Sequence, residues 1–390
     1  MATTQYLSYR MKQPKTLLLV VIALFALLLV SCIPGTAQPM GGWSGATVHD
    51  GVVYVGSKDG RVVAINASTR ELQWFYAVTP RALIYTTPIV DGDLVYVGTY
   101  SGKVLTLNTT TRSQDLPFPQ KRYGEWEWDC PIDNAKSNAI VADLAISEDA
   151  LYVASSNGRV YSLDKGSGDL NWKSETLDEK YKKLWTSPVI QGDTLYVSTF
   201  DGHIYALSVE TGELLDWSFE AEAGFASSPI IYEGVIYVGS FDNNLYTIRI
   251  DDGELLWKFR GGKWFWAAPL VSEGVVYAAC LDGKLYAIEA KTGEKMWEFD
   301  AGNPIVSSPV LMDNLLIVTD ESGIVYVFDL SAELEDEAVP LKAISIGADV
   351  RSSFCAQEGL VYIRDEDNRL YVVDIDKMEV SEPISLTKEE

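Results

Sequence analysis

The stretch Trp266–Phe299, WAAPLVSEGVVYAACLDGKLYAIEAKTGEKMWEF, decides the fold of this protein. It reads as four short strands joined by three turns, and each turn carries a glycine of the kind that tight hairpins favour. The predicted strands are Ala267–Val271, Val275–Cys280, Leu285–Glu289 and Met296–Phe299. Strands this short cannot bury their apolar faces alone, so the unit is expected to stack against copies of itself.

The same unit recurs along the whole chain. Its second strand carries an aromatic marker at Tyr54, Tyr96, Tyr152, Tyr196, Tyr237, Tyr277 and Tyr362, with Ile317 in the seventh copy. By subtraction, successive markers are 40 to 56 residues apart, and a four-stranded propeller blade takes about 40 to 45 residues. The sequence therefore predicts an all-β protein, an eight-bladed β-propeller of four-stranded antiparallel blades. Two ways of closing the ring remain open: the eighth unit docks directly on the first, or residues before Trp43 add a strand.

The predicted fourth strands share a tryptophan. It occurs at Trp74, Trp172, Trp217, Trp257 and Trp297. We interpret these residues as structural wedges between blades, because a large ring at an equivalent position in each unit can bury itself against the neighbouring sheet. Truncating one such ring is expected to cost about 3 to 5 kcal/mol.

The N-terminus reads as an export signal. Basic residues precede the apolar run Leu17–Val30, whose fourteen residues are too few to cross a bilayer, which needs about 20. The run ends in Leu-Val-Ser-Cys32, which resembles a bacterial lipobox, in which the cysteine is acylated and becomes the new N-terminus. An ordinary signal peptide cut further on, for instance after Ala37, is the alternative.

The lipobox interpretation gives the domain organisation. Residues 1–31 are the lipoprotein signal peptide, 32–42 a lipidated flexible tether, and 43–390 a single monomeric propeller with a long loop at 117–137 between blades 2 and 3. Acyl chains on Cys32 would anchor the protein to the bacterial cell membrane or outer membrane, on the periplasmic or extracellular side.

The charge of the chain excludes one class of partner. It carries 31 lysine and arginine residues against 55 aspartate and glutamate residues, a net charge of −24. A field of this sign repels nucleic acid and anionic headgroups. We therefore expect no nucleic-acid partner.

The repeat resembles a known family. The recurring pattern of Ser-Pro, Tyr-Val-Gly-Ser, Tyr-Ala, Thr-Gly-Glu and Trp is similar to the pyrroloquinoline-quinone-type propeller repeat. It is clearest at Ser228-Pro229, Tyr237–Ser240, Tyr205-Ala206, Thr211–Glu213 and Trp257. Within that family, an eight-unit lipoprotein of this length resembles the BamB lipoproteins of outer-membrane β-barrel assembly. The resemblance implies a non-catalytic scaffold on the cell envelope that binds an envelope protein, as yet unidentified.

Few residues are equipped for chemistry. Quinoprotein dehydrogenases of this fold hold the quinone with calcium in the central channel and commonly pair adjacent cysteines. The four cysteines here, Cys32, Cys130, Cys280 and Cys355, are all separated. Both histidines, His49 and His203, lie beside turns and do not suggest a metal centre or a triad. We predict no catalytic residue, metal or cofactor, with Cys130 as the exposed thiol.

Two other functions remain as alternatives. One is a quinoprotein dehydrogenase or redox protein that uses the central channel. The other is an extracellular propeller that binds a glycan or another ligand through exposed aromatic side chains.

A candidate binding face follows from the repeat register. Innermost first strands begin at the channel mouth, and aromatic or basic residues occupy this position in several units. The candidate residues are Trp43, Tyr85, Trp185, Trp266 and Arg351, with the adjacent Phe225 and Trp264 and with Trp126 and Trp128 from the long loop. Arg351 and Lys263 are expected to make the rim locally positive and suited to an acidic segment. Clustered surface aromatics often mark binding sites, but rings that cover their neighbours' apolar edges remain an equal alternative.

Overall fold

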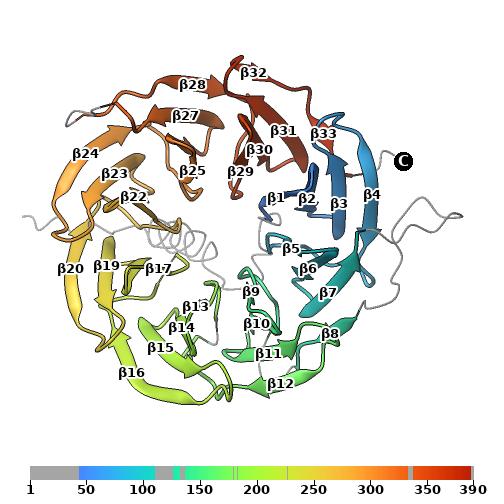
Figure 1. Ribbon diagram of the computed structural model, residues 1–390, viewed down its shortest axis with the longest axis vertical. Helices are drawn as coiled ribbons and strands as arrows, with labels where there is room; N and C mark the ends of the chain where they lie inside the picture. The colour runs from blue at the N-terminus through green and yellow to red at the C-terminus, as the bar shows by residue number, and fades with distance from the viewer. Residues whose placement is uncertain are drawn as a thin grey trace, which may run out of the picture. The chain divides into compact units, whose positions relative to one another are not determined.

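Eight sheets surround a central axis, and each sheet forms one blade of a β-propeller (Figure 1). The computed structural model describes residues 44–109, 126–131, 137–178, 180–181, 183–225, 227–332 and 337–387. These residues belong to the unit Gly41–Glu390, and the predicted all-β, eight-bladed propeller is confirmed. The predicted signal peptide, Cys32, the tether and Trp43 lie outside the described residues. Within the described ranges, no helix is long and apolar enough to cross a membrane.

The strands follow one another around the ring in chain order. Blade 1 contains β1 (Ala46–His49), β2 (Val52–Gly56), β3 (Arg61–Asn66) and β4 (Leu72–Ala77). Blade 2 contains β5 (Ile89–Asp91), β6 (Leu94–Gly98), β7 (Lys103–Asn108) and β8 (Glu127–Asp129). Blade 3 contains β9 (Ala145–Ile146), β10 (Ala150–Ala154), β11 (Val160–Asp164) and β12 (Leu170–Lys173). Blade 4 contains β13 (Val189–Gln191), β14 (Thr194–Ser198), β15 (His203–Ser208) and β16 (Leu214–Glu220).

The second half of the ring repeats this order. Blade 5 contains β17 (Ile230–Tyr232), β18 (Val235–Gly239), β19 (Asn244–Arg249) and β20 (Leu255–Arg260). Blade 6 contains β21 (Leu270–Ser272), β22 (Val275–Ala279), β23 (Lys284–Glu289) and β24 (Lys295–Asp300). Blade 7 contains β25 (Val310–Met312), β26 (Leu315–Thr319), β27 (Ile324–Asp329) and β28 (Lys342–Ser345). Blade 8 contains β29 (Cys355–Gln357), β30 (Leu360–Arg364), β31 (Arg369–Asp374), β32 (Glu379–Val380) and β33 (Ile384–Ser385), the last paired with β31.

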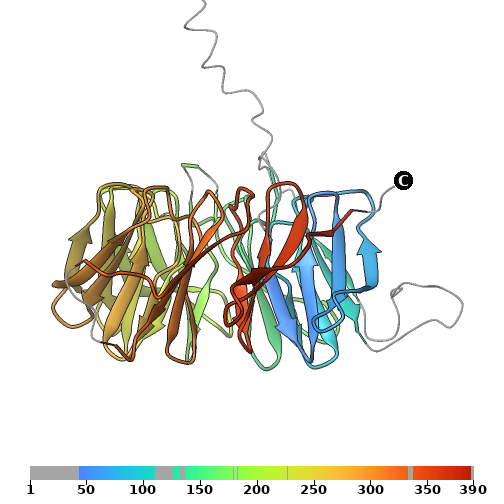
Figure 2. The same cartoon turned by 90° about the horizontal axis from the view of Figure 1, so that it is seen from above.

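The side view in Figure 2 shows the blades standing next to one another around the axis, so their broad faces meet. Central strands are therefore covered on both faces, and four of the five residues of β22 are buried. This explains why the second strands are continuous apolar runs rather than alternating ones. The hairpin from β21 to β22 turns at Glu273 and Gly274, whose φ angles of 50° and 78° fit a two-residue turn with two positive φ values.

The fourth-strand tryptophans lie between blades. The indole nitrogen of Trp172 donates a hydrogen bond of 2.8 Å to the carbonyl of Val209 in the next blade, and Trp257 bonds Ala290 in the same way at 3.0 Å. Trp172 also packs on Tyr152 of its own blade, with ring centroids 5.9 Å apart. Trp172 and Trp257 thus each join the core of their own blade to the backbone of the following blade.

Blade 2 corrects the prediction for residues 117–137. Within that range, β8 is the outer strand of blade 2, so this part is not a loop between blades. Trp126 is only 8% exposed, and its indole nitrogen donates to the carbonyl of Lys165 at 3.0 Å, as the indole nitrogens of Trp172 and Trp257 donate to the backbone of their following blades. By subtraction, Trp126 follows the second-strand Tyr96 by 30 residues, whereas Trp74 follows Tyr54 by 20. Because of this longer interval, Trp126 was not recognised in the sequence as equivalent to the other fourth-strand tryptophans.

Cys130 follows β8 and is not the exposed thiol that the sequence predicted. It is 3% exposed, and its Sγ donates to the hydroxyl of Ser155 at 3.3 Å. Its backbone N–H donates to Gly102 at 2.7 Å and so ties the end of β8 to blade 2. The prediction was wrong because it placed this residue in a loop.

The ring closes by direct docking of blade 8 on blade 1. Buried side chains of both blades form a single apolar cluster, in which Val53 and Val63 of blade 1 join Tyr362 and Val372 of blade 8. The backbone N–H of Lys58 donates to the Asn368 side chain at 3.1 Å across the same junction. Among the described residues, all strands of these two blades lie after residue 45; residues before Trp43, which the alternative closure needed, lie outside the described residues.

Candidate functional site

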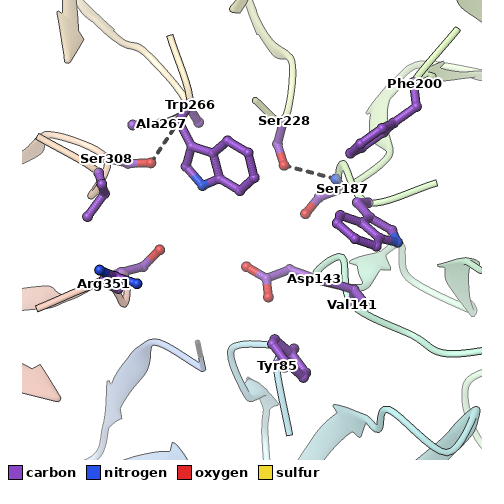
Figure 3. Close-up of a pocket in the computed structure, with 14 residues that line it drawn as sticks. Tyr85, Val141, Asp143, Ser187, Phe200, Ser228, Trp266, Ala267, Ser308 and Arg351 are labelled. Carbon is purple, nitrogen blue, oxygen red and sulfur yellow. Dashed lines mark hydrogen bonds between the residues drawn. The ribbon is translucent and has the colours of Figure 1, made fainter. Parts of the chain in front are cut away.

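First strands begin around a central cavity of about 240 Å³ (Figure 3). One set of lining residues occupies the first-strand position found in the sequence: Tyr85, Val141, Trp185, Trp266, Val306 and Arg351. A second set lies two residues further along each chain segment: Asp143, Ser187, Ser228, Ala268, Ser308 and Ser353. Residues two apart in an extended segment point to the same side, so blades 3, 4, 6, 7 and 8 each contribute both positions to the channel, and blades 2 and 5 contribute one.

Hydrogen bonds between neighbouring blades fix this lining. The backbone N–H of Ser187 donates to the Ser228 hydroxyl at 2.9 Å, and the N–H of Ala268 donates to the Ser308 hydroxyl at 3.1 Å. The N–H of Thr87 donates to Oδ1 of Asp143 at 2.5 Å. A short polar side chain in one blade therefore accepts from the backbone of the preceding blade, and these groups are held in place around the channel.

Aromatic side chains gather in one sector of the mouth, at blades 4 to 6. Phe200 lies between Trp185 and Phe241, with ring centroids 5.0 and 5.2 Å away. Phe241 continues the series to Trp264 at 5.0 Å and to Trp266 at 6.1 Å. Trp264 is 43% exposed and is the outermost ring. We call these five residues the aromatic sector.

Phe200 and Phe241 were missed from the sequence. Each immediately precedes the aspartate of the turn between the second and third strands, where Tyr100 and Leu281 occupy the equivalent position of other blades. That turn and the start of the first strand were expected on one face of the propeller. An apolar residue at this turn position therefore indicates a side chain at the channel mouth, and this pattern could have been recognised in the sequence.

Three of the proposed binding residues do not face the mouth. Phe225 is fully buried and packs on Tyr246, because it precedes the channel-facing position by one residue and so points to the opposite side. Trp126 is the wedge of blade 2, and Trp128 packs on Tyr161 with centroids 5.0 Å apart. Of the proposed face, Tyr85, Trp185, Trp264, Trp266 and Arg351 lie at or beside the channel mouth.

The expected positive rim is also corrected. The guanidinium of Arg351 lies 2.6 Å from a carboxylate oxygen of Glu321 and 2.7 Å from one of Glu366. These two carboxylates outweigh its single charge, so Arg351 does not make the rim positive. The sequence showed the arginine but not the acids that three-dimensional stacking places on either side of it.

A second cavity of about 360 Å³ adjoins the first and extends outward between blades 6 and 7. Its lining residues are Lys263, Trp266, Leu281, Pro304, Val306, Glu321 and Arg351. Trp266, Val306 and Arg351 line both cavities. The mouth therefore continues into a mainly apolar groove beside the aromatic sector.

Asp143 is the one carboxylate among the residues that line the central cavity. Burial among protein atoms raises its pKa to about 6, although the channel leaves part of the side chain open. In an unfolded chain the carboxyl would titrate near pH 3.9. The ionised carboxylate is thus less favourable in the folded protein than in the unfolded one.

We predict that Asp143→Asn stabilises the protein at neutral pH. Below about pH 4 the carboxyl is protonated in both states and carries no penalty. The penalty grows as pH rises from about 4 to 6, and is complete above the folded pKa. The amide can still accept from Thr87, so the variant should gain about 1 to 3 kcal/mol at pH 7.5. Urea unfolding of the variant and the wild type at pH 7.5 and at pH 3.5 measures this gain. A gain in stability that persists at pH 3.5 contradicts the explanation.

The histidines do not assemble a catalytic or metal site. His203 lies in the turn region of blade 4, with Nδ1 3.2 Å from Asp201, and its ring stacks on Tyr205. His49 lies 3.6 Å from the exposed Asp50. Across the part of the chain that the structure describes, no group of three or more histidine, cysteine, aspartate or glutamate side chains is arranged to hold a metal ion.

Comparisons with known proteins agree with the fold. A family model described as outer membrane protein assembly factor BamB matches residues 35–180, 120–258 and 217–385. The crystal structure of BamB from Moraxella catarrhalis is similar with a TM-score of 0.65 and 18% identity, over 84% of this chain and 93% of that one. The computationally designed Ika8 protein is similar with a TM-score of 0.68 and 15% identity, over 85% of this chain and 96% of the other. No curated protein matches the sequence.

Proposed function

Because this chain belongs to the family of the outer membrane protein assembly factor BamB, we propose that it is a non-catalytic propeller lipoprotein that binds another envelope protein during outer-membrane protein assembly. Membership of this family supports a setting on the periplasmic side of the cell envelope. The propeller supplies a rigid support, because a shared apolar cluster joins each blade to the next. The partner remains to be identified.

The aromatic sector is the observation that carries this proposal. Its five rings lie at blades 4 to 6, three of the eight blades, and extend from the central cavity to the exposed Trp264. Aromatic anchors of this kind dominate the energy of protein interfaces. The groove between blades 6 and 7 offers further apolar surface next to them. Arg351 is matched by its two glutamates, so we base the docking on aromatic contact and not on attraction of an acidic segment.

We expect Trp264→Ala to weaken partner capture strongly. Losing one interface anchor costs about 2 kcal/mol or more, which is roughly a thirtyfold change in affinity. The melting temperature should change little, because Trp264 is exposed. Solubilised envelope proteins of the source bacterium are captured on the purified protein and quantified by mass spectrometry.

Leu72→Ala is the matched control for this experiment. Leu72 is 50% exposed and begins the outer strand of blade 1, away from the mouth. Its truncation removes exposed apolar surface and should leave capture of outer-membrane assembly proteins unchanged. Equal capture by the Trp264 variant and the wild type would move the binding face elsewhere.

Membrane anchoring is a separate part of the proposal and rests on the lipobox at Cys32. Cys32→Ala should abolish acylation and leave the protein as unprocessed precursor or in the soluble exported fraction. Cell fractionation and mass determination of the mature N-terminus measure both. Unchanged membrane association with cleavage at another residue would show that Cys32 is not the anchor.

A further inference from the structure

We propose that the central cavity binds a small organic cation with an alkylated ammonium group, held by Asp143 and by the aromatic rings of Tyr85, Trp185 and Trp266. This site goes beyond the proposed docking of a protein partner, since it lies inside the channel. Each of these four residues lies near the start of the first strand of a different blade.

The charges around the cavity favour a cation. Asp143 accepts a hydrogen bond from the backbone N–H of Thr87. Among the described residues, no lysine, arginine or histidine forms an ion pair with it. Figure 3 shows Arg351 on the opposite side of the cavity from Asp143. That arginine is already paired with Glu321 and Glu366, so two other carboxylates balance its charge. A net charge of −24 over the whole chain raises the local concentration of small cations further.

The walls suit an alkylated ammonium head. Such a group is attracted to the faces of tryptophan and tyrosine rings and loses little hydration on leaving water. The Trp185 ring of this site already attracts one ammonium group, because Nζ of Lys183 lies over it, 4.7 Å from its centroid. A neutral sugar would use the same rings but would gain nothing from the charge of Asp143.

The size of the cavity limits the ligand. A volume of about 240 Å³ corresponds to roughly eight water molecules at about 30 Å³ each. This suits a choline-sized molecule, whose polar tail would reach the hydroxyls of Ser187, Ser228 or Ser308 around the channel.

Isothermal titration of the purified full-length protein with choline tests this proposal. We expect a Kd of about 1 mM or tighter, together with a change in tryptophan fluorescence. The neutral analogue 3,3-dimethyl-1-butanol has the same shape without the charge and should bind at least tenfold more weakly. Phosphatidylcholine vesicles form a second arm: binding to vesicles that choline inhibits identifies a lipid headgroup as the source, and binding to free choline alone identifies a soluble ligand.

Variants separate the site from the fold. Asp143→Asn should weaken choline binding at least tenfold while raising the stability of the protein, so that lost binding is not explained by unfolding. Trp266→Ala should weaken binding similarly, and Leu72→Ala should not change it. Absence of heat and of a fluorescence change at tens of millimolar choline would overturn the proposal, as would equal binding of the neutral analogue or of Asp143→Asn. None of these outcomes bears on capture of a protein partner.

Discussion

Replacing Gly212 by alanine is expected to lower the free energy of unfolding by about 3 to 5 kcal/mol. Two independent constraints meet at this residue. Its φ angle of +71° is unfavourable for a residue with a side chain. A β-carbon here would also lie 2.3 Å from Cε3 of Trp172, the wedge from the preceding blade. Since Trp172 is fixed by its hydrogen bond to Val209, either the indole or the turn must move.

Gly192→Ala is the matched control in the same blade. Gly192 has a φ of +58°, but no atom lies within 4 Å of the position that its β-carbon would take. Gly192→Ala should therefore lower the free energy of unfolding only by the cost of a positive φ angle, about 1 to 2 kcal/mol. Urea unfolding of both variants isolates the contact with the wedge as the difference between them. Equal losses would mean that the glycine of the Thr-Gly-Glu motif serves the turn alone.

The second large effect is expected at Arg364, where Arg364→Ala should cost about 3 to 5 kcal/mol. This side chain is 1% exposed, although it ends a strand where other blades carry glycine, alanine, serine or threonine. Burial lowers its pKa to about 10, and the charges of Asp365 and Asp59 oppose that shift. Because Asp59 belongs to blade 1, the arginine lies where blade 8 meets blade 1. Its removal leaves a cavity and takes a cation away from two buried carboxylates.

Arg249→Ala provides the comparison for this variant. Arg249 pairs with Asp252 and Glu254 at 2.8 Å each, but its side chain and both carboxylates are well exposed to water. Exposed ion pairs contribute little to stability because water screens them, so its loss should be small. The expected result is a clear fall in melting temperature for the Arg364 variant alone. Similar melting of the two would show that the ring closure does not depend on a buried charge.

Arg364 also shows what can be predicted from the repeat pattern and what cannot. In the motif Tyr-Val-Gly-Ser of other blades, the glycine position is held by arginine in blade 8, and this departure is visible in the sequence. The burial of Arg364 cannot be read from the sequence, because it depends on blade 1, which lies some 300 residues earlier in the chain. The same reason applies to Arg351, whose neighbouring glutamates come from blade 7 and from the turn of its own blade.

Sequence alone predicted most of the strands, their order and the number of blades. These properties follow from local spacing: a short strand, a turn glycine and an aromatic marker repeat at about one blade length, and a four-stranded unit of this size has to stack on its copies. The alternation of side chains along extended segments also placed Tyr85, Trp185 and Trp266 together at the channel, since equivalent positions in each blade point inward.

Tertiary structure decided what the surrounding blades do to each side chain. The longer interval in blade 2 hid the wedge position of Trp126, and only the pairing of β8 with β7 reveals it. Stacking of blades buries Phe225 and Cys130, brings two acids to Arg351, and assembles Phe200 and Phe241 with the tryptophans of the mouth. Periodicity along one chain segment specifies the direction of a side chain, but burial, charge balance and aromatic clustering depend on neighbours that are distant in sequence.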